Sequence, residues 1–424
     1  MTIAHKEYRL IGEEVWSGKL PNGLSVFVVP KRGFHKRYAF LAADYGSADR
    51  RFRLGGDWVD TPGGVAHFLE HKMFDTEEGS ALAKLSANGA SPNAYTSTDV
   101  TAYYFECIDR FTENLRTLLS FVSTPYFTPE GIDKERGIIG QEILMVEDDP
   151  DYCLYYGLMR SLFRHNPLRD YVTGTVESIA DITADTLYGC HKAFYSPSNM
   201  ALGVAGDVEP AEVFDIAQDV LPDEPGMAPE RDYGPPEALL PQAPRFTGSM
   251  EVSLPTFLAG CKSEPVSGGP DSLKLELVSD IALDILAGHS SPLFFRLYGQ
   301  GHVNSDFSAS FEASTGAAYS MFGGEARDPD RVFGEVNDEI ARLSEKGPDP
   351  ELYGRIMKAA TGSCIRSFNS FDAICANLVC SHFRGYDIFE APEILSAVTE
   401  GDIITFLRER LIPDNMAISI IGPK

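Results

Sequence analysis

Two histidines and one glutamate lie close together in the stretch GGVAHFLEHKMF, which begins at Gly63. They are His67, Glu70 and His71. On an α-helix, positions i, i+3 and i+4 share one face, so the three side chains would point in the same direction. Imidazole and carboxylate groups are both good zinc ligands. The spacing therefore indicates a metal site on one helix face; a structural pair of histidines is the alternative.

A catalytic zinc ion takes three protein ligands and keeps a fourth position for water, so two histidines need a donor from elsewhere. A helix predicted to start at Thr128-Pro129 and to stop near Asp149 offers Glu135 and Glu142, two helical turns apart and so on one face. Single helical glutamates are usually solvated. Glu142 nevertheless has apolar neighbours, namely Ile138, Ile139, Ile143 and Leu144. If it is buried among them, it needs a partner.

The elements that must position these residues are a mixture of strands and helices. Runs typical of strands occur at residues 24–30, 38–46, 91–98 and 101–107. Pro92 marks the third run as an edge strand, because proline cannot donate to the hydrogen-bond ladder. Thr61 and Pro62 are typical of a helix N-cap and first helical position, and Gly63 and Gly64 allow another backbone to approach. Without a βαβ rhythm, we expect an α+β fold in which helices cover one side of a mainly antiparallel sheet.

The chain contains two similar halves. YSPSNMALGVAGD, from Tyr195, reappears as LIPDNMAISIIGP, from Leu411, and Pro197 matches Pro413 at an offset of 216 residues (413 − 197). The segment between the halves is rich in proline and poor in periodic apolar residues, as linkers are. We therefore predict two homologous α/β domains and a linker. The predicted ranges are 1–221 for the metal-bearing domain, 222–248 for the linker and 249–424 for the second domain.

Composition narrows the classes of partner and the compartment. The 424 residues carry a formal net charge of −26, which repels nucleic-acid phosphates and anionic lipids. The seven cysteines are scattered, odd in number and without a CxxC pair, so they are typical of reduced residues in a cytoplasmic protein. No run of 18 apolar residues and no signal peptide occurs. We expect no nucleic-acid or membrane partner.

Three motifs in this order are shared with a known family. HFLEH, NAYTS in a following edge strand and KERGIIGQEI resemble the inverzincin peptidases of the pitrilysin and insulinase family. The likeness is greatest to the short, two-domain branch that includes mitochondrial processing peptidase and paired bacterial peptidases, and it spans essentially the whole chain. The resemblance implies one zinc ion per chain, held by His67, His71 and Glu142. It also implies that Glu70 is the catalytic base and that Glu135 supports the site from behind.

The segment ASPNAYTST, residues 90–98, is a plausible edge for a peptide substrate. An extended peptide can add to such an edge through main-chain hydrogen bonds. From the residues alone, an ordinary hairpin is an equal alternative. The resemblance favours substrate binding, because Asn93, Ala94, Tyr95 and Thr96 match the substrate-edge motif of the family.

The second half lacks the metal-binding residues. The offset of 216 takes the positions of the site to apolar residues and a lysine, namely Leu283, Leu286, Ala287 and Lys358. Catalytic members of the family also carry an arginine and a tyrosine here that hold the substrate. This chain has Tyr298 and Asn304 at those positions, and Arg296 has the wrong spacing to replace the arginine. The resemblance therefore implies a heterodimer with a zinc-less sister subunit; a homodimer is the competing assembly.

These observations predict a zinc endopeptidase that hydrolyses unfolded or short peptides in a chamber formed with a second subunit. The alternative is a non-catalytic, metal-bound peptide-binding or assembly subunit. A serine hydrolase is disfavoured, because GHSSP near His289 is not a G-x-S-x-G elbow. The remaining histidines receive no role; they are His5, His35, His165, His191, His289, His302 and His382.

Overall fold

The computed structural model describes residues 2–314 and 316–424 and divides the chain into two compact units. Unit 1 comprises Met1–Ile143, Tyr171–Tyr233 and Ile365–Phe389, and unit 2 comprises Leu144–Asp170, Gly234–Cys364 and Glu390–Lys424. Each unit contains a mainly antiparallel sheet with helices packed on it, which confirms the predicted α+β class. The division into 1–221, 222–248 and 249–424 concerns the two sequence copies and stays a prediction.

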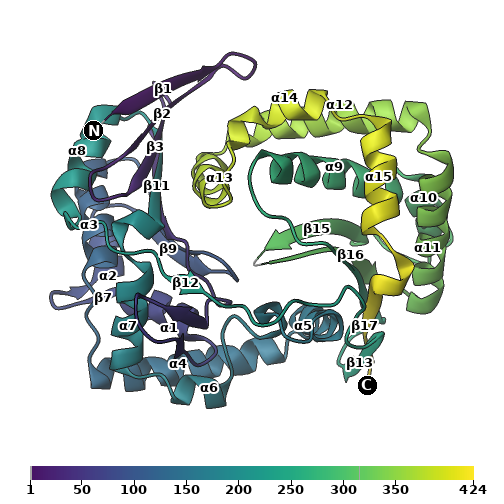
Figure 1. Cartoon of the computed structure of the whole chain (residues 1–424), viewed down its shortest axis with the longest axis horizontal. Helices are drawn as coiled ribbons and strands as arrows, with labels where there is room; N and C mark the ends of the chain where they lie inside the picture. Colours follow the sequence, from purple (N-terminus) through teal and green to yellow (C-terminus); the bar gives the residue numbers. More distant parts are fainter. Residues whose placement is uncertain (1, 315) are drawn as a thin grey trace. The chain divides into compact units, whose positions relative to one another are not determined.

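Unit 1 is built on a seven-stranded sheet (Figure 1). In spatial order the strands are β1 (Ile3–Tyr8), β2 (Glu13–Lys19), β3 (Ser25–Pro30), β11 (Met200–Gly206), β4 (Arg37–Ala43), β10 (Thr101–Cys107) and β9 (Ser91–Thr96). The pair β3–β11 is parallel, and the other neighbouring pairs are antiparallel. All four strand runs expected from the sequence are present, and β9 is an edge strand, as Pro92 predicts.

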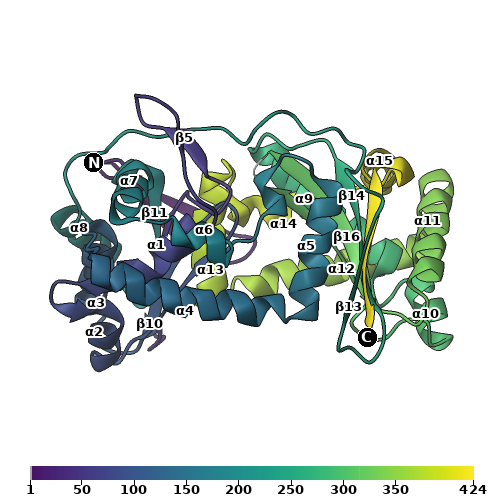
Figure 2. The same cartoon turned by 90° about the horizontal axis from the view of Figure 1, so that it is seen from below.

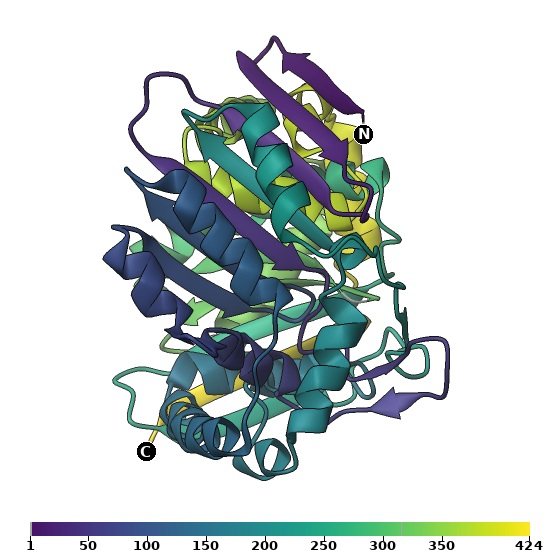
Figure 3. The ribbon, with the colours of Figure 1, turned by 90° about the vertical axis from the view of Figure 1, so that its left-hand side faces the viewer.

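Helices cover one face of this sheet and bury its apolar side chains. They are α1 (Val65–Met73), α2 (Ala81–Ala87), α3 (Phe111–Ser123), α7 (Ala184–Phe194) and α8 (Pro210–Val220). Figure 3 views the unit from this helical side. Val26, Val28 and Leu202 point into the resulting core and are fully buried. A core of this kind forms because removing apolar side chains from water is the main favourable term in folding.

The opposite face of the unit 1 sheet is also covered, which the sequence did not lead us to expect. Helix α13 (Phe371–Phe383) packs there against β11 and β4. Gly203 of β11 allows the close approach, because a Cβ at this position would lie 3.0 Å from the backbone oxygen of Cys375. The expectation of helices on one side only is therefore wrong, and the reason is that a helix from the second half of the sequence supplies the second layer.

Unit 2 repeats this arrangement on a five-stranded sheet (Figure 2). Its strands, in spatial order, are β13 (Arg245–Met250), β17 (Met416–Pro423), β14 (Thr256–Ser263), β16 (Ala317–Glu325) and β15 (Ser308–Ser314). The core on one face includes side chains of α9 (Pro270–Ala287), α10 (Pro292–Gly299), α11 (Pro329–Lys346), α12 (Pro350–Ser367), α14 (Ala391–Ser396) and α15 (Glu400–Arg410). Helix α5 (Pro150–Leu162) packs on the other face, where Gly260 leaves room for Leu158 and Leu162.

The two halves of the sequence therefore exchange one helix each. Helix α5 belongs to the first half but packs in unit 2, and α13 belongs to the second half but packs in unit 1. The duplication itself is visible in matching elements at the predicted offset. Thr183 and Thr399 cap α7 and α15 through their side chains, and Pro197 and Pro413 each begin a short 3-10 helix.

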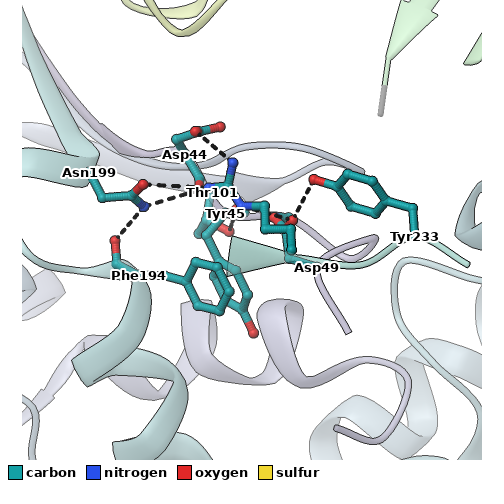
Figure 4. Close-up of polar contacts among 9 residues, drawn as sticks. Asp44, Tyr45, Asp49, Thr101, Phe194, Asn199 and Tyr233 are labelled. Atoms are coloured by element: carbon teal, nitrogen blue, oxygen red, sulfur yellow. Dashed lines mark hydrogen bonds and ion pairs between the residues drawn. The ribbon is translucent and has the colours of Figure 1, made fainter. Parts of the chain in front are cut away.

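The start of the linker is fixed to unit 1 by a buried ion cluster (Figure 4). Strand β12 (Glu230–Arg231) pairs with β5 (Arg51–Arg53), which in turn pairs with β6 (Val59–Asp60). Arg231 donates to Asp44 at 2.9 Å and lies 3.2 Å from the carboxylate of Asp49. Burial raises the pKa of Asp49 to about 6, although the nearby Arg231 opposes this shift. Tyr233 donates to the same carboxylate at 2.9 Å.

All seven cysteines are free, and four of them are buried, namely Cys107, Cys190, Cys261 and Cys375. Within residues 2–314 and 316–424, no helix combines the length and the apolar character needed to cross a bilayer.

Candidate metal centre

Helix α1 carries the H-x-x-E-H motif and is held rigidly in unit 1. Nearly all of its residues are buried, including Phe68 and Leu69, which are fully inaccessible. The helix begins after Gly64, whose φ of 89° is a left-handed conformation that favours glycine. A Cβ at Gly64 would lie 2.5 Å from the carbonyl oxygen of Thr173, so the expected close backbone approach occurs here. Ser178 donates to the carbonyl of the neighbouring Gly63 at 2.8 Å.

The predicted start of this helix is wrong. Thr61 was expected to be the N-cap and Pro62 the first helical residue, but α1 begins at Val65 and has no side-chain cap. The hydroxyl of Thr61 instead donates to the carbonyl of Arg50 at 3.0 Å. A left-handed residue cannot lie inside a right-handed helix, so Gly64 delays the start by one turn.

Helix α4 (Pro129–Glu147) supplies the carboxylates, as the sequence predicts, and starts at the expected residue. Its core-facing residues are Ile132, Ile139 and Ile143. Lys72 of α1 lies beneath its first turn, almost fully buried and ion-paired with Asp75. A Cβ at Gly131 would lie 2.9 Å from the amine of Lys72, so a larger residue here would displace the end of this lysine side chain.

Three side chains from these helices converge in a geometry that suits zinc. His67 Nε2 lies 3.5 Å from Glu142 Oε1, and His71 Nε2 lies 3.6 Å from Glu142 Oε2. Donor atoms of all three residues lie within 4.8 Å of one another. Tetrahedral zinc with bonds of 2.0–2.1 Å places its ligand atoms about 3.4 Å apart. Two nitrogens and one carboxylate at these separations therefore fit the ion.

Glu135 lies behind the site rather than in it. Its Oε1 is 3.0 Å from Nδ1 of His71, which leaves Nε2 of the same ring directed at Glu142. Such a hydrogen bond fixes the tautomer and orientation of a metal-binding histidine. Nδ1 of His67 is buried and has no hydrogen-bond partner in the described part of the chain, so its Nε2 is the nitrogen available to a metal.

The electrostatics of the site attract positive charge. Burial lowers the pKa of His71, but the hydrogen bond to Glu135 and the carboxylates of Glu70, Glu135 and Glu142 outweigh it, so the net shift is upward. The hydrogen bond to His67 lowers the pKa of Glu142 despite partial burial. A divalent cation would balance these carboxylates.

Glu70 shares the helix face but is not one of the three converging donors. Only 8% of its surface is exposed. Its Oε2 accepts a hydrogen bond of 2.7 Å from the hydroxyl of Thr96 in β9. A buried carboxylate beside a metal site, with no ligand role, is suited to accept a proton.

The four residues predicted to bind substrate all lie on β9, but on two faces of the sheet. Asn93 and Tyr95 are exposed, and Tyr95 lies against the rings of Phe40 and Tyr104. Ala94 packs against the core on the side of α1, and Thr96 reaches Glu70 on the same side. The strand edge is unpaired within the described residues, so its outward main-chain groups can accept another strand.

In the second copy, the positions that correspond to the metal ligands do not form a site. Leu283 and Leu286 are buried in the core of unit 2, and Lys358 is exposed. Arg296 is paired with Glu335 at 3.1 Å. Tyr298 is 52% exposed, and Asn304 donates to Glu325 at 2.8 Å.

Two functional features were missed by sequence reasoning. One is the bond from the Thr96 side chain to Glu70, because the motif assigned Thr96 only to substrate binding. The other is Lys72, which positions α1 against α4 from an almost fully buried site. The i, i+3 spacing of Lys72 and Asp75 was a readable sign of a pair, but nothing in the sequence indicates that the pair is buried.

An inverted H-x-x-E-H helix, a glutamate from a second helix and two copies of one α/β unit are the features of the two-domain metallopeptidase class. Comparison with known proteins supports this class. Residues 56–176 match the family model "Insulinase (Peptidase family M16)", and residues 181–360 match "Peptidase M16 inactive domain". The chain belongs to this insulinase, or M16, family, which confirms the resemblance.

Individual relatives agree with the family. The chain is 36% identical over 427 residues to the "Uncharacterized zinc protease YmfH" of Bacillus subtilis (strain 168), covering 99% of each chain. It is 29% identical over 216 residues to a probable mitochondrial-processing peptidase subunit beta of Arabidopsis thaliana, covering 50% of this chain and 39% of that one. A solved structure of a putative M16-like peptidase from Alicyclobacillus acidocaldarius superposes with a TM-score of 0.94 at 35% identity, covering 97% and 99%.

Proposed function

We propose that this chain is a zinc-dependent endopeptidase that hydrolyses unfolded or short peptides. The observation that carries the proposal is the convergence of His67, His71 and Glu142 at zinc-ligand separations, with Glu70 beside them but outside the ligand set. Relatives named as zinc proteases support the same activity. One zinc ion per chain is proposed, because the described residues contain this one group of suitable donors.

The roles of the side chains follow from their positions. When bound, zinc would lower the pKa of a coordinated water and polarise the peptide carbonyl. Glu70 would take the proton from the attacking water and deliver it to the leaving amine, acting as base and then as acid. Glu135 would hold the ring of His71 through Nδ1. No other titratable group is needed for this proton transfer.

The substrate is proposed to bind as an added strand. The free edge of β9 offers main-chain donors and acceptors, and α1 with its motif packs next to this strand. Asn93, Ala94, Tyr95 and Thr96 would therefore line an extended peptide. Because main-chain hydrogen bonds carry the binding, the enzyme would select for unfolded backbone more than for a particular sequence.

A second subunit is part of the proposal. Tyr298 and Asn304 stand where catalytic relatives of this type are expected to have arginine and tyrosine, and Arg296 is already paired with Glu335. We propose a cytoplasmic heterodimer in which a zinc-less sister chain supplies these residues and closes a chamber; a homodimer is the competing assembly. The missing pair also favours a second candidate function, a non-catalytic subunit that binds metal and peptide.

Glu70→Gln tests the activity without disturbing the ligands. The variant should keep one zinc per chain by elemental analysis and lose cleavage of a quenched fluorescent peptide by at least about 100-fold, the scale of a lost general base. His67→Ala should lose zinc as well. Glu77→Gln, an exposed glutamate outside the site, is the matched control and should retain both properties.

The wild type and each variant are assayed alone and in a mixture with a zinc-less homologue, for which a neighbouring reading frame is the first candidate. Cleavage that appears only in the mixture supports the heterodimer. If the protein binds zinc but no combination cleaves the peptide, the proposal of a peptidase is wrong and the non-catalytic subunit is the better assignment.

A further inference from the structure

Thr96 makes the hydrogen bond that holds the carboxylate of Glu70. The distance from Thr96 Oγ1 to Glu70 Oε2 is 2.7 Å, and the residues are 26 positions apart, in β9 and α1. An ionised carboxylate can only accept, so the threonine hydroxyl is the donor. Among the described residues, Thr96 is the hydrogen-bond donor to the Glu70 side chain. The orientation of the carboxylate therefore depends on the strand.

The register of the hairpin shows where the main chain of Thr96 points. Ser97 N donates to the carbonyl of Val100 at 2.8 Å, so the N–H of Ser97 is turned toward β10, although its carbonyl accepts from Ser47 N at 3.0 Å. In an antiparallel pair these groups alternate in direction from one residue to the next. Tyr95 and Asn93 therefore also face β10, whereas Thr96 and Ala94 direct their N–H and C=O groups to the free edge.

Pro92 supports this assignment independently. It has the same parity as Ala94 and Thr96 and lies opposite Phe105. A proline has no N–H to give to a partner strand, so it fits the outward-facing set. The free edge thus offers the N–H and C=O of Thr96 and the carbonyls of Ala94 and Pro92, whereas the N–H of Ala94 donates to Oδ1 of Asn93 at 2.9 Å.

We infer that Thr96 is a positioning residue that couples the docking edge to Glu70. Its main chain faces the edge where a peptide would add, and its side chain orients the group that moves the proton. A docked strand that fixes the backbone of Thr96 also fixes the hydroxyl, and through it the carboxylate. Catalytic groups must be held within about 0.5 Å of the productive position, and a glutamate with three rotatable bonds needs such support. This inference rests on the proposed function.

Thr96→Val removes the hydroxyl and keeps the branched shape that suits a strand. Zinc content should stay at one per chain, KM should change less than about threefold, and kcat should fall about 10- to 100-fold, the range for groups that orient a metal site. Thr96→Ser restores the donor and should recover kcat to within about threefold of the wild-type value. In crystal structures of the zinc-loaded variants, the Glu70 carboxylate should keep its wild-type position in Thr96→Ser. In Thr96→Val it should be rotated away from that position.

Thr112→Val is the matched control, because Thr112 donates to Glu212 at 2.8 Å between α3 and α8, away from the metal centre. Its kcat should equal that of the wild type. A Thr96→Val variant with wild-type kcat and only a lower melting temperature would mean that Thr96 merely satisfies a buried carboxylate, and the inference would be overturned. If the wild type cleaves no peptide, the proposed function fails separately; the crystallographic position of Glu70 in the valine variant then decides the positioning role by itself.

Discussion

His191 should make the stability of the protein depend on pH in a measurable direction. It lies in α7 with 8% of its surface exposed, and its Nε2 is 3.0 Å from the carbonyl of Val122 in α3. Its ring also stacks on Tyr195. Burial lowers the pKa of His191 from 6.5 to about 4, although the bond to the carbonyl opposes the shift. The native state therefore keeps this histidine neutral in a range of pH where the unfolded chain protonates it.

The sign and size of the effect follow from this shift. Between pH 6.5 and 4 the unfolded state binds the extra proton, so the contribution of His191 to stability is present above pH 6.5 and is lost as pH falls. At about 1.36 kcal/mol per pKa unit, the loss between pH 7.5 and 4.5 is about 2.5 kcal/mol. Urea unfolding of metal-free wild type and of His191→Gln should be compared across this range, since glutamine can still donate to the carbonyl and does not titrate.

The expected result is a difference in unfolding free energy between the two proteins that shrinks by about 2.5 kcal/mol as pH falls from 7.5 to 4.5. The comparison uses metal-free protein, because a bound zinc ion would stabilise the native state and would dissociate at low pH as its ligands are protonated. Parallel curves for the two proteins would refute the reasoning. They would mean that His191 titrates alike in both states, and hence that its ring is hydrated in the native protein.

Two other regions give predictions of the same kind. Glu135→Ala should weaken zinc affinity or activity about 10- to 100-fold by removing the acceptor for Nδ1 of His71, measured by competition with a chromogenic chelator. Arg231→Met should lower the free energy of unfolding by about 3–5 kcal/mol, because it leaves the buried Asp49 and the half-buried Asp44 without their cation, and thermal unfolding would report it. Burial raises the pKa of Asp49 to about 6, so its contribution falls as pH rises from 3.8 to 6. The unfolding free energy of Asp49→Asn should therefore rise relative to that of the wild type as pH increases across that interval. A difference between the two proteins that does not change with pH would contradict the raised pKa of Asp49.

The candidate metal ligands could be predicted from the sequence because their geometry is local. His67 and His71 are placed by helical periodicity alone, and the two acids of α4 are related by two turns of one helix. Helical geometry alone could not decide which acid is the candidate ligand. Glu135 and Glu142 lie two turns apart on the same face of one helix, so either could face the histidines. Their distances from the rings separate them: Glu142 faces Nε2 and Glu135 faces Nδ1.

The features that sequence reasoning missed depend on tertiary contacts. Thr61 has the chemistry of an N-cap, but its hydroxyl bonds the carbonyl of Arg50, and Gly64 sets the start of the helix. The exchange of α5 and α13 could not be predicted from the sequence either, because an apolar helix face does not indicate against which sheet it packs. Gly203 and Gly260 lie where α13 and α5 contact the two sheets. In the sequence, however, a glycine within a strand does not show that a helix packs against it.

The difference between the two copies at these positions is consistent with one balance of energies. Unit 1 gathers the carboxylates of Glu70, Glu135 and Glu142 around two imidazoles, and these carboxylates raise the pKa of His71 despite its burial. Burying such charges is costly unless a partner compensates them. A copy that binds no metal gains stability by replacing them with apolar residues, as Leu283 and Leu286 do in the core of unit 2. Retention of the whole polar cluster in unit 1 is therefore itself an argument that a metal ion belongs there.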